Sequence, residues 1–216
     1  MIMTDCLITE NTASTVDGGG IQAESSTVSI YNSILSLNSA YAKGGAIVTS
    51  VTASNPSPAK LTVVGSKFTS NNVVEQGGAV FVAQDTTADF HDVEFTANSV
   101  IGDGFSGYYG GGALTSLTFI NYETNLFGCS FDGNTDGSGT ARDIKDGTDG
   151  VSGTVTVHSD CLESYWWTGQ KGDALDTSGI VLGTAFSYSC LPTCSPGEAR
   201  APSGDMACSG CPSGSR

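Results

Sequence analysis

Apolar and polar residues alternate in short runs along the first 150 residues of the chain. Val28 and Ile30 flank a serine, and Leu61 and Val63 flank a threonine in the same way. A spacing of two places successive apolar side chains on one face of a β-strand. No apolar pattern with the spacing of a helix persists from one run to the next. The chain is therefore predicted to be all-β.

These runs belong to a motif that recurs five times and ends on an asparagine. A large apolar residue stands three positions before each asparagine, and these residues are Ile8, Leu35, Phe68, Phe95 and Phe131. Four copies continue into a pair of glycines, a small residue and an apolar residue, at 18–21, 44–47, 77–80 and 111–114. Self-similarity at a period of tens of residues predicts a stack of equivalent structural units.

The period of the motif predicts how these units stack. Val28 follows Met1 by 27 residues and Ala88 follows Leu61 by 27, whereas Leu61 follows Val28 by 33 and Thr124 follows Ala88 by 36. A unit of 27 residues has room for three short strands and three turns. Such a unit matches one rung of a parallel β-helix, whose strands pair with their equivalents about 4.8 Å along the axis. Residues 1–150 are predicted to form about five rungs, right-handed by general preference.

Stacked rungs would bring equivalent side chains together. A column of asparagines predicts a hydrogen-bonded ladder at a turn, because a side-chain amide both donates and accepts hydrogen bonds. The ladder residues are Asn11, Asn38, Asn71, Asn98 and Asn134. The glycine pairs predict a turn that requires positive φ or a close approach of stacked backbones.

The paired motifs GGA[ILV] and FxxN resemble the repeat of the chlamydial polymorphic outer membrane proteins. The matching segments are Gly44–Ile47, Gly77–Val80, Gly111–Leu114, Phe68–Asn71, Phe95–Asn98 and Phe131–Asn134. The resemblance covers about residues 1–146, and the C-terminal region departs from the pattern. It implies a secreted surface domain, a right-handed β-helix and a role in adhesion.

Charge and composition narrow the choice of partners. The 216 residues include 22 acidic and 8 basic ones, which gives a formal net charge of −14. Nucleic acid and anionic membranes bind basic patches, so neither is an expected partner. No apolar run approaches the roughly 20 residues needed to span a bilayer, and the first residues lack the features of a signal peptide. Because the first rung also lacks a polar cap, we expect the chain to be part of a longer protein.

An insertion at residues 102–110 is a candidate ligand site. It holds three aromatic residues, Phe105, Tyr108 and Tyr109, among glycines. Loops on a rigid scaffold often carry binding functions. The three rings could form a platform for a sugar or for the surface of a partner protein. Alternatively, they fold back over the side of the β-helix.

Residues 132–143 offer oxygen ligands at the spacing of a calcium loop. The candidate ligands are Asp132, Asn134, Asp136 and Asp143, with glycines that permit a sharp turn. Against calcium, Gly139 takes the place of the usual apolar anchor and the last ligand is Asp, not Glu. Asn134 is also a member of the predicted ladder. The alternative is an ordinary turn rich in Asp, Asn and Gly, and no other cofactor is expected.

The C-terminal part divides into a predicted cap at 151–189 and a tail at 190–216. The tail elements CxPG and CxxCPxG, at Cys194–Gly197 and Cys208–Gly214, resemble ephrin-receptor-like or tumour-necrosis-factor-receptor-like extracellular modules. We expect a small disulfide-rich tail, with the pairs Cys161–Cys190 and Cys194–Cys208 and with Cys211 bonded to a partner beyond Arg216. Cys6 and Cys129 lie in one column about 19 Å apart, too far to bridge, and are expected to be buried thiols.

Signals of catalysis are weak. The basic residues do not cluster at stacked positions, and neither His91 nor His158 has a partner that can be named from the sequence. The pairs Asp89 with Asp92 and Asp143 with Asp146 are the candidates for a glycosidase-type carboxylate pair, but solvated turn residues explain them much better.

We therefore predict a non-catalytic extracellular or cell-surface β-helix that acts as a structural spacer or adhesin, with a carbohydrate or a surface or matrix protein as its partner. The alternative is a carbohydrate-active enzyme of the pectate-lyase type or a carbohydrate-binding module. The two are distinguished by whether acidic and basic side chains converge on one solvent-facing surface.

Overall fold

The computed structural model places strands, turns and no helices in the part of the chain that it describes. This part comprises residues 1–15, 17–51, 57–102, 110–116, 122–137, 143–146, 154–160, 186–191, 198–200 and 208–210. Its strands form four parallel sheets, called A to D here, and one short antiparallel pair. The predicted all-β class is thus confirmed, with parallel sheets. In the described residues we find no helix with the length and hydrophobicity needed to cross a lipid bilayer.

Sheet A has seven strands and sheet B has five. In spatial order, sheet A consists of β1 (Ile2–Thr4), β5 (Thr27–Tyr31), β9 (Ala59–Val64), β13 (Thr86–His91), β17 (Tyr122–Phe127), β20 (Thr154–Asp160) and β21 (Phe186–Leu191). Sheet B consists of β2 (Leu7–Thr9), β6 (Ile34–Ser36), β10 (Lys67–Thr69), β14 (Glu94–Thr96) and β18 (Ser130–Asp132).

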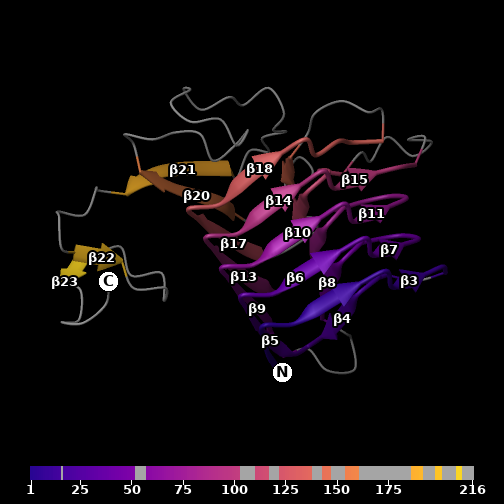
Figure 1. Ribbon diagram of the computed structural model, residues 1–216, viewed down its shortest axis with the longest axis horizontal. Coiled ribbons are helices and arrows are strands. Elements are labelled where there is room, and N and C mark those ends of the chain that lie inside the picture. The colour runs from indigo at the N-terminus through magenta and orange to yellow at the C-terminus, as the bar shows by residue number, and fades with distance from the viewer. Residues whose placement is uncertain are drawn as a thin grey trace.

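Sheets C and D complete the arrangement. Sheet C consists of β3 (Thr12–Ala13), β7 (Ser39–Ala40), β11 (Asn72–Val73) and β15 (Ser99–Val100). Sheet D consists of β4 (Ile21–Glu24), β8 (Ile47–Ser50), β12 (Val80–Val82), β16 (Leu114–Ser116) and β19 (Ile144–Asp146). Figure 1 shows β3, β7, β11 and β15 one above another at one side, with β5, β9, β13 and β17 in the same succession at the other.

The chain contributes strands to sheets A, B, C and D in turn and then returns to sheet A. One such circuit is called a pass. Each strand pairs with its counterpart in the next pass, as where Ser29 pairs with Ile2 and with Thr62, and Asp89 pairs with Thr62 and with Asn125. The predicted offsets of 27, 33, 27 and 36 residues are therefore confirmed as pairing registers of sheets A and B. Sheet D has other offsets, as where Leu114 pairs with Val80 and with Ile144. The predicted three strands per unit are wrong, because sheet C adds a fourth. Its strands are two residues long, too short to show an alternating pattern.

The core lies between the sheets and is filled by the predicted apolar columns. Sheet A contributes Val28, Ile30, Leu61, Val63, Ala88, Phe90 and Leu126, and sheet B contributes Leu35, Phe68, Phe95 and Phe131. The rings of Phe68, Phe95 and Phe131 stack in sequence, with centroids 5.0 Å apart at both contacts. Parallel in-register pairing brings like residues together, so one apolar column becomes a continuous stack.

Tight turns between the sheets place residues in the left-handed region at equivalent positions of successive passes. Between sheets A and B these residues are Asp5, Asn32, Gly65, Asp92 and Gly128, with φ from 48° to 61°. Between sheets B and C they are Glu10, Leu37, Ser70, Ala97 and Gly133, with φ from 53° to 62°. Leu37 and Ala97 have no polar side chain to favour this conformation, so the stacked neighbours must impose it.

The glycine pairs before sheet D serve the two purposes predicted for them. The first glycine has φ of 71° at Gly18, 62° at Gly44 and 71° at Gly77. The second glycine lies against the backbone of the next pass. A Cβ at Gly45 would overlap the carbonyl oxygen of Gly78, and one at Gly78 would overlap that of Gly112. Only glycine permits the backbones to approach this closely.

Beyond residue 150 the described segments are strands. β20 pairs in parallel with β17, and β21 pairs in parallel with β20, so both extend sheet A. β21 spans the predicted boundary between residues 189 and 190. β22 (Glu198–Arg200) and β23 (Cys208–Gly210) form the antiparallel pair.

Candidate functional site

The asparagine column forms the predicted ladder. Nδ2 of each asparagine donates to Oδ1 of the next one at 2.9 to 3.0 Å, from Asn11 through Asn134. The backbone N–H of the same residue donates to the same oxygen at 3.0 to 3.2 Å. From Asn38 onward, Nδ2 also donates to the backbone oxygen of the large apolar residue in the preceding pass. The amides of Asn38, Asn71 and Asn98 therefore each connect three passes.

The C-terminal end of the ladder lies within the predicted calcium loop. Nδ2 of Asn134 donates to Oδ1 of Asp143 at 2.9 Å, so a carboxylate of the same pass is the acceptor for the last amide of the ladder. Asn134, Asp136 and Asp143 are buried, whereas Asp132 is exposed on the outer side of β18. Oδ1 of Asn134 accepts two hydrogen bonds from Asn98.

This geometry assigns Asn134 to the ladder. Its amide oxygen is occupied, so a cation at this loop would have to use the carboxylates. In the described part of the chain, no group of three or more His, Cys, Asp or Glu side chains is arranged to hold a metal ion. Calcium binding stays a prediction.

The other predicted site residues fall largely outside the described residues. Phe105, Tyr108 and Tyr109 lie there, and so do Cys161 and Cys194. Cys190 is part of β21 and Cys208 is part of β23, with only their backbones described. The aromatic platform and the two disulfide pairs therefore stay predictions.

Cys6 and Cys129 are free thiols. Cys129 is 1 % exposed, as predicted, and burial raises the pKa of its thiol to about 12. Cys6 is only half-buried, because it belongs to the first pass, which has a neighbouring pass on one side only. The column between the two thiols contains Ser33 and Ser66, and the hydroxyl of Ser66 accepts from the backbone N–H of Ser33 at 3.0 Å.

The outer side of sheet A carries a group of polar side chains from three successive passes. Asn125 pairs directly with Asp89, and its Nδ2 donates to Oδ1 of Asp89 at 3.0 Å and to Oε1 of Glu123 at 3.2 Å. Nζ of Lys60 lies 3.5 Å from Oδ2 of Asp89. Lys60 pairs in register with Thr87, so its ion pair with Asp89 is diagonal. Asp89 is thus the centre of a network that joins the third, fourth and fifth passes.

His91 lies on the same outer side of β13 as Asp89. Its imidazole stacks on the ring of Phe127, with centroids 4.5 Å apart and planes 1° apart. His91 is only 6 % exposed, although its position in the strand directs it away from the core. Among the described residues, no hydrogen bond reaches either ring nitrogen.

The charge state of His91 follows from this setting. Burial lowers the pKa of His91 below its ordinary 6.5, and Lys60 acts in the same direction, while Asp89 and Asp92 oppose the change. The ring is therefore neutral at pH 7, with one nitrogen that donates and one that accepts. Lys60, Asp89, His91, Glu123 and Asn125 are called the sheet A polar cluster from here on.

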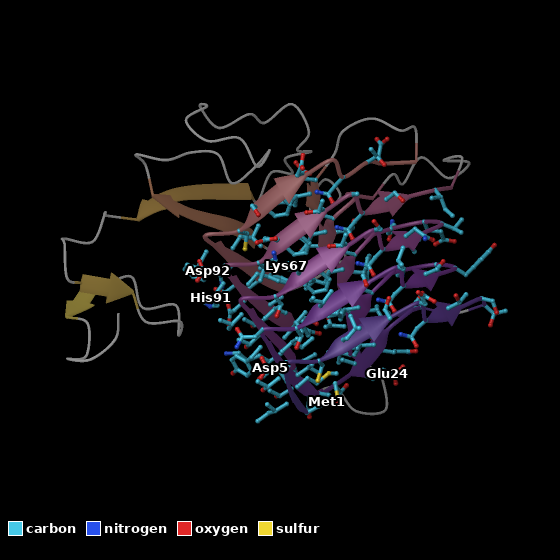
Figure 2. The ribbon with its side chains drawn as sticks, in the orientation of Figure 1. Met1, Asp5, Glu24, Lys67, His91 and Asp92 are labelled. Atoms are coloured by element: carbon cyan, nitrogen blue, oxygen red, sulfur yellow. The ribbon has the colours of Figure 1, made fainter. Side chains whose placement is uncertain are left out.

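Asp92 follows the cluster directly and occupies the turn between sheets A and B. Figure 2 shows His91 and Asp92 next to each other at the outer edge of the ribbon. The carboxylate of Asp92 lies over the backbone of Gly128, where a Cβ would stand 2.5 Å from Oδ1 of Asp92. Burial of this carboxyl group raises the pKa of Asp92, and His91 opposes the rise. Glycine at position 128 leaves the space that this carboxylate occupies.

The sequence contained part of the signal for this cluster. The repeat offsets predict that Asp89 and Asn125 are neighbours, and the alternation within each strand places Asp89 and His91 on the same face. The diagonal contact of Lys60 and the stacking of His91 on Phe127 depend on side-chain conformations. Those contacts became visible only in the structure.

Comparisons with known proteins add no relative. A scan against protein-family models matched none, and searches of curated proteins and of solved structures returned no match either.

Proposed function

We propose that residues 1–150 form a right-handed parallel β-helix that acts as a rigid, non-catalytic spacer and adhesive segment of a larger extracellular or cell-surface protein. The parallel sheets support this proposal, because the chain visits them in a fixed order and returns to a stacked position after each pass. The resemblance of the motifs to a family of secreted surface domains supports the location and the adhesive role.

The unbroken asparagine ladder is the observation that carries the spacer role. It extends through all five passes from Asn11 to Asn134, and the phenylalanine stack follows the same direction through the last three. Each pass is tied to the next by backbone pairing, by side-chain amides and by a common core. A scaffold with such continuous coupling resists bending and local opening.

The two insertions in the repeat lie where a scaffold that presents binding loops would carry them. The residues that lengthen the second and fourth passes lie between β8 and β9 and between β15 and β16. Both insertions therefore leave the stacked strands undisturbed. Loops on a rigid framework are the usual carriers of binding functions.

The sheet A polar cluster favours a carbohydrate-active enzyme or a carbohydrate-binding module as a second candidate. Acidic and basic side chains meet there on one outward face, which is the feature expected of that class. Lyase chemistry on acidic sugars needs cations that neutralise the substrate's carboxylate as well as a base. His91 offers a lone pair for the base, but the ammonium group of Lys60, which is the cation of the cluster, is paired with Asp89. The cluster therefore supports binding better than it supports lyase chemistry.

Two measurements on the purified chain test the proposal. Relaxation of ¹⁵N amides should give uniform order parameters near ~0.85 from β1 to β18, as in a rigid backbone. Blocks of passes with different mobility would contradict a rigid spacer. Incubation with a panel of polysaccharides, with and without calcium, should leave the polymers intact, and any cleavage product would contradict the non-catalytic role.

A further inference from the structure

We propose that the sheet A polar cluster is a binding site for uncharged carbohydrate, with Lys60, Asp89 and His91 as its principal hydrogen-bonding residues. The inference deepens the adhesive part of the proposed function and rests on it, whereas the spacer part stands without it.

His91 is the first observation that points to a ligand. A polar ring that is more than nine-tenths buried normally has hydrogen-bond partners, and a buried orphan calls for an explanation such as a water molecule or a ligand. Stacking on Phe127 fixes the plane of the ring but satisfies neither nitrogen. The site thus offers one donor and one acceptor with no partner among the described residues.

The other hydrogen-bonding groups of the cluster that are still available to a ligand also include both donors and acceptors. Asn125 uses both amide hydrogens on Asp89 and Glu123, so its Oδ1 is left as an acceptor. Lys60 has three N–H donors and directs one toward Asp89, and each carboxylate keeps lone pairs beyond those already used. Free donors and acceptors are therefore both present on three neighbouring strands, which are spaced about 4.8 Å apart.

This combination of free donors and acceptors favours some classes of ligand over others. A phosphate, sulfate or uronate offers mainly acceptors and would be repelled by Asp89 and Glu123. A guanidinium or ammonium group offers only donors, so it would leave Lys60 and the N–H of His91 without partners. A sugar hydroxyl both donates and accepts, and carries no charge. Neutral glycans are the one class of the three that satisfies every group of the cluster.

The chain itself provides a matched control for this site. Lys67 and Glu94 form a similar cross-strand ion pair between the third and fourth passes, at 2.6 Å, but on sheet B. Their side chains are 52 % and 50 % exposed, so loss of this pair has little effect on the fold. Figure 2 labels Lys67 on the strand β10, away from His91 and Asp92.

The test uses the 216-residue chain and three variants. Asp89→Ala removes the centre of the network, Glu94→Ala is the control, and His91→Phe keeps a ring that can stack on Phe127 but removes both nitrogens. The probes are an array of neutral, sulfated, uronate-bearing and amino oligosaccharides and an oligoarginine peptide, followed by calorimetric titration of the tightest neutral oligosaccharide.

Wild type and Glu94→Ala are expected to bind neutral glycans with equal affinity. Asp89→Ala and His91→Phe should bind them at least about tenfold more weakly, as the loss of a hydrogen bond to a charged or buried group implies. His91→Phe should keep its melting temperature, which separates loss of the site from loss of the fold. Binding of no neutral glycan, equal binding by His91→Phe, or a preference for acidic glycans or oligoarginine would each overturn the assignment. None of these outcomes affects the test of the spacer by relaxation.

Discussion

Asn71 and Asn98 are 27 residues apart in the chain, yet Nδ2 of Asn71 donates to Oδ1 of Asn98 at 2.9 Å. The backbone N–H of Asn71 donates to the same oxygen at 3.0 Å, and both side chains are fully buried. One carbonyl oxygen thus satisfies two donors of the preceding pass. The ladder is therefore part of the backbone hydrogen bonding at this turn, not an addition to it.

Replacement of Asn71 by alanine should be strongly destabilising. The change removes the acceptor for two donors of Asn38 and the donor to the backbone oxygen of Leu35, all of them buried or largely buried. Buried polar groups without partners cost about 1–3 kcal/mol each, and partial relaxation should limit the total to about 3 kcal/mol. Urea unfolding followed by circular dichroism measures the loss.

Asn11→Ala is the matched control, because Asn11 is exposed at the first pass. Its replacement should lower the free energy of unfolding by about 1 kcal/mol or less. Equal losses for the two variants would show that the ladder contributes no more than ordinary surface hydrogen bonds.

Gly78→Ala should prevent the native stacking of sheet D. The added Cβ would overlap the carbonyl oxygen of Gly112 and backbone atoms of Ser99, and neither is a flexible side chain that could move aside. We expect a loss of more than about 3 kcal/mol or an unfolded chain. Thermal unfolding measured by circular dichroism would show it.

Gly133→Ala measures the cost of a left-handed backbone conformation without the cost of a close backbone contact. Gly133 has φ of 62°, but its nearest neighbour to an added Cβ, the backbone nitrogen of Ala97, is 4.0 Å away. Only the left-handed conformation is penalised there, by about 1 kcal/mol. A Gly133 variant as unstable as the Gly78 variant would disprove the close-approach explanation.

Acidification should destabilise the fold through His91. Its pKa is lowered in the folded state, so the unfolded chain takes up the proton first as the pH falls below about 6.5. The contribution of His91 to stability is complete above that pH and decreases below it. Asp92 has a raised pKa and acts oppositely, because the folded state then takes up its proton first and gains stability at more acidic pH.

The prediction for His91 is checked by urea unfolding at pH 7.5 and 5.5. Wild type should lose more stability between these values than His91→Phe, whose ring does not titrate. The same loss in both proteins would mean that other groups cause the acid sensitivity. Asp92→Asn provides the control for the opposing contribution.

Cys129 should resist alkylation in the folded protein. Its thiol is buried and has a pKa of about 12, so almost no reactive thiolate exists at pH 8. Iodoacetamide labelling with mass spectrometric mapping should leave Cys129 unmodified until urea is added, whereas the half-buried Cys6 should react earlier. Modification of both residues at one rate would contradict the burial of Cys129.

Much of the fold could be predicted because its constraints repeat. The columns of Phe68 and Asn71 identified the stacked positions, and the offsets between copies gave the pairing registers of sheets A and B without any knowledge of side-chain contacts. Sheet C escaped prediction because two-residue strands such as Asn72–Val73 carry no alternation. The left-handed conformation of Leu37 and Ala97 also escaped it, since neither residue favours that region.

The candidate site was less predictable for a different reason. The sequence identified Asp89 as a candidate catalytic carboxylate. Its contacts with Lys60 and Asn125, however, depend on side-chain rotamers and on two different repeat offsets at once. The orphaned nitrogens of His91 are a property of packing, and no residue pattern signals them. Conversely, the spacing of a calcium loop at Asp132 and Asn134 was visible in the sequence. In the structure, Asp132 points outward and Asn134 forms the hydrogen bonds of the ladder.

Successive passes stack in parallel and in register, and NMR contacts between backbone protons are the sharpest test of this arrangement. In-register stacking predicts cross-strand contacts that link Thr62 with Ser29 and with Asp89, and Asp89 with Asn125, at offsets of 33, 27 and 36 residues. Contacts between sequential strands in an antiparallel pattern, or registers shifted from these offsets, would contradict it.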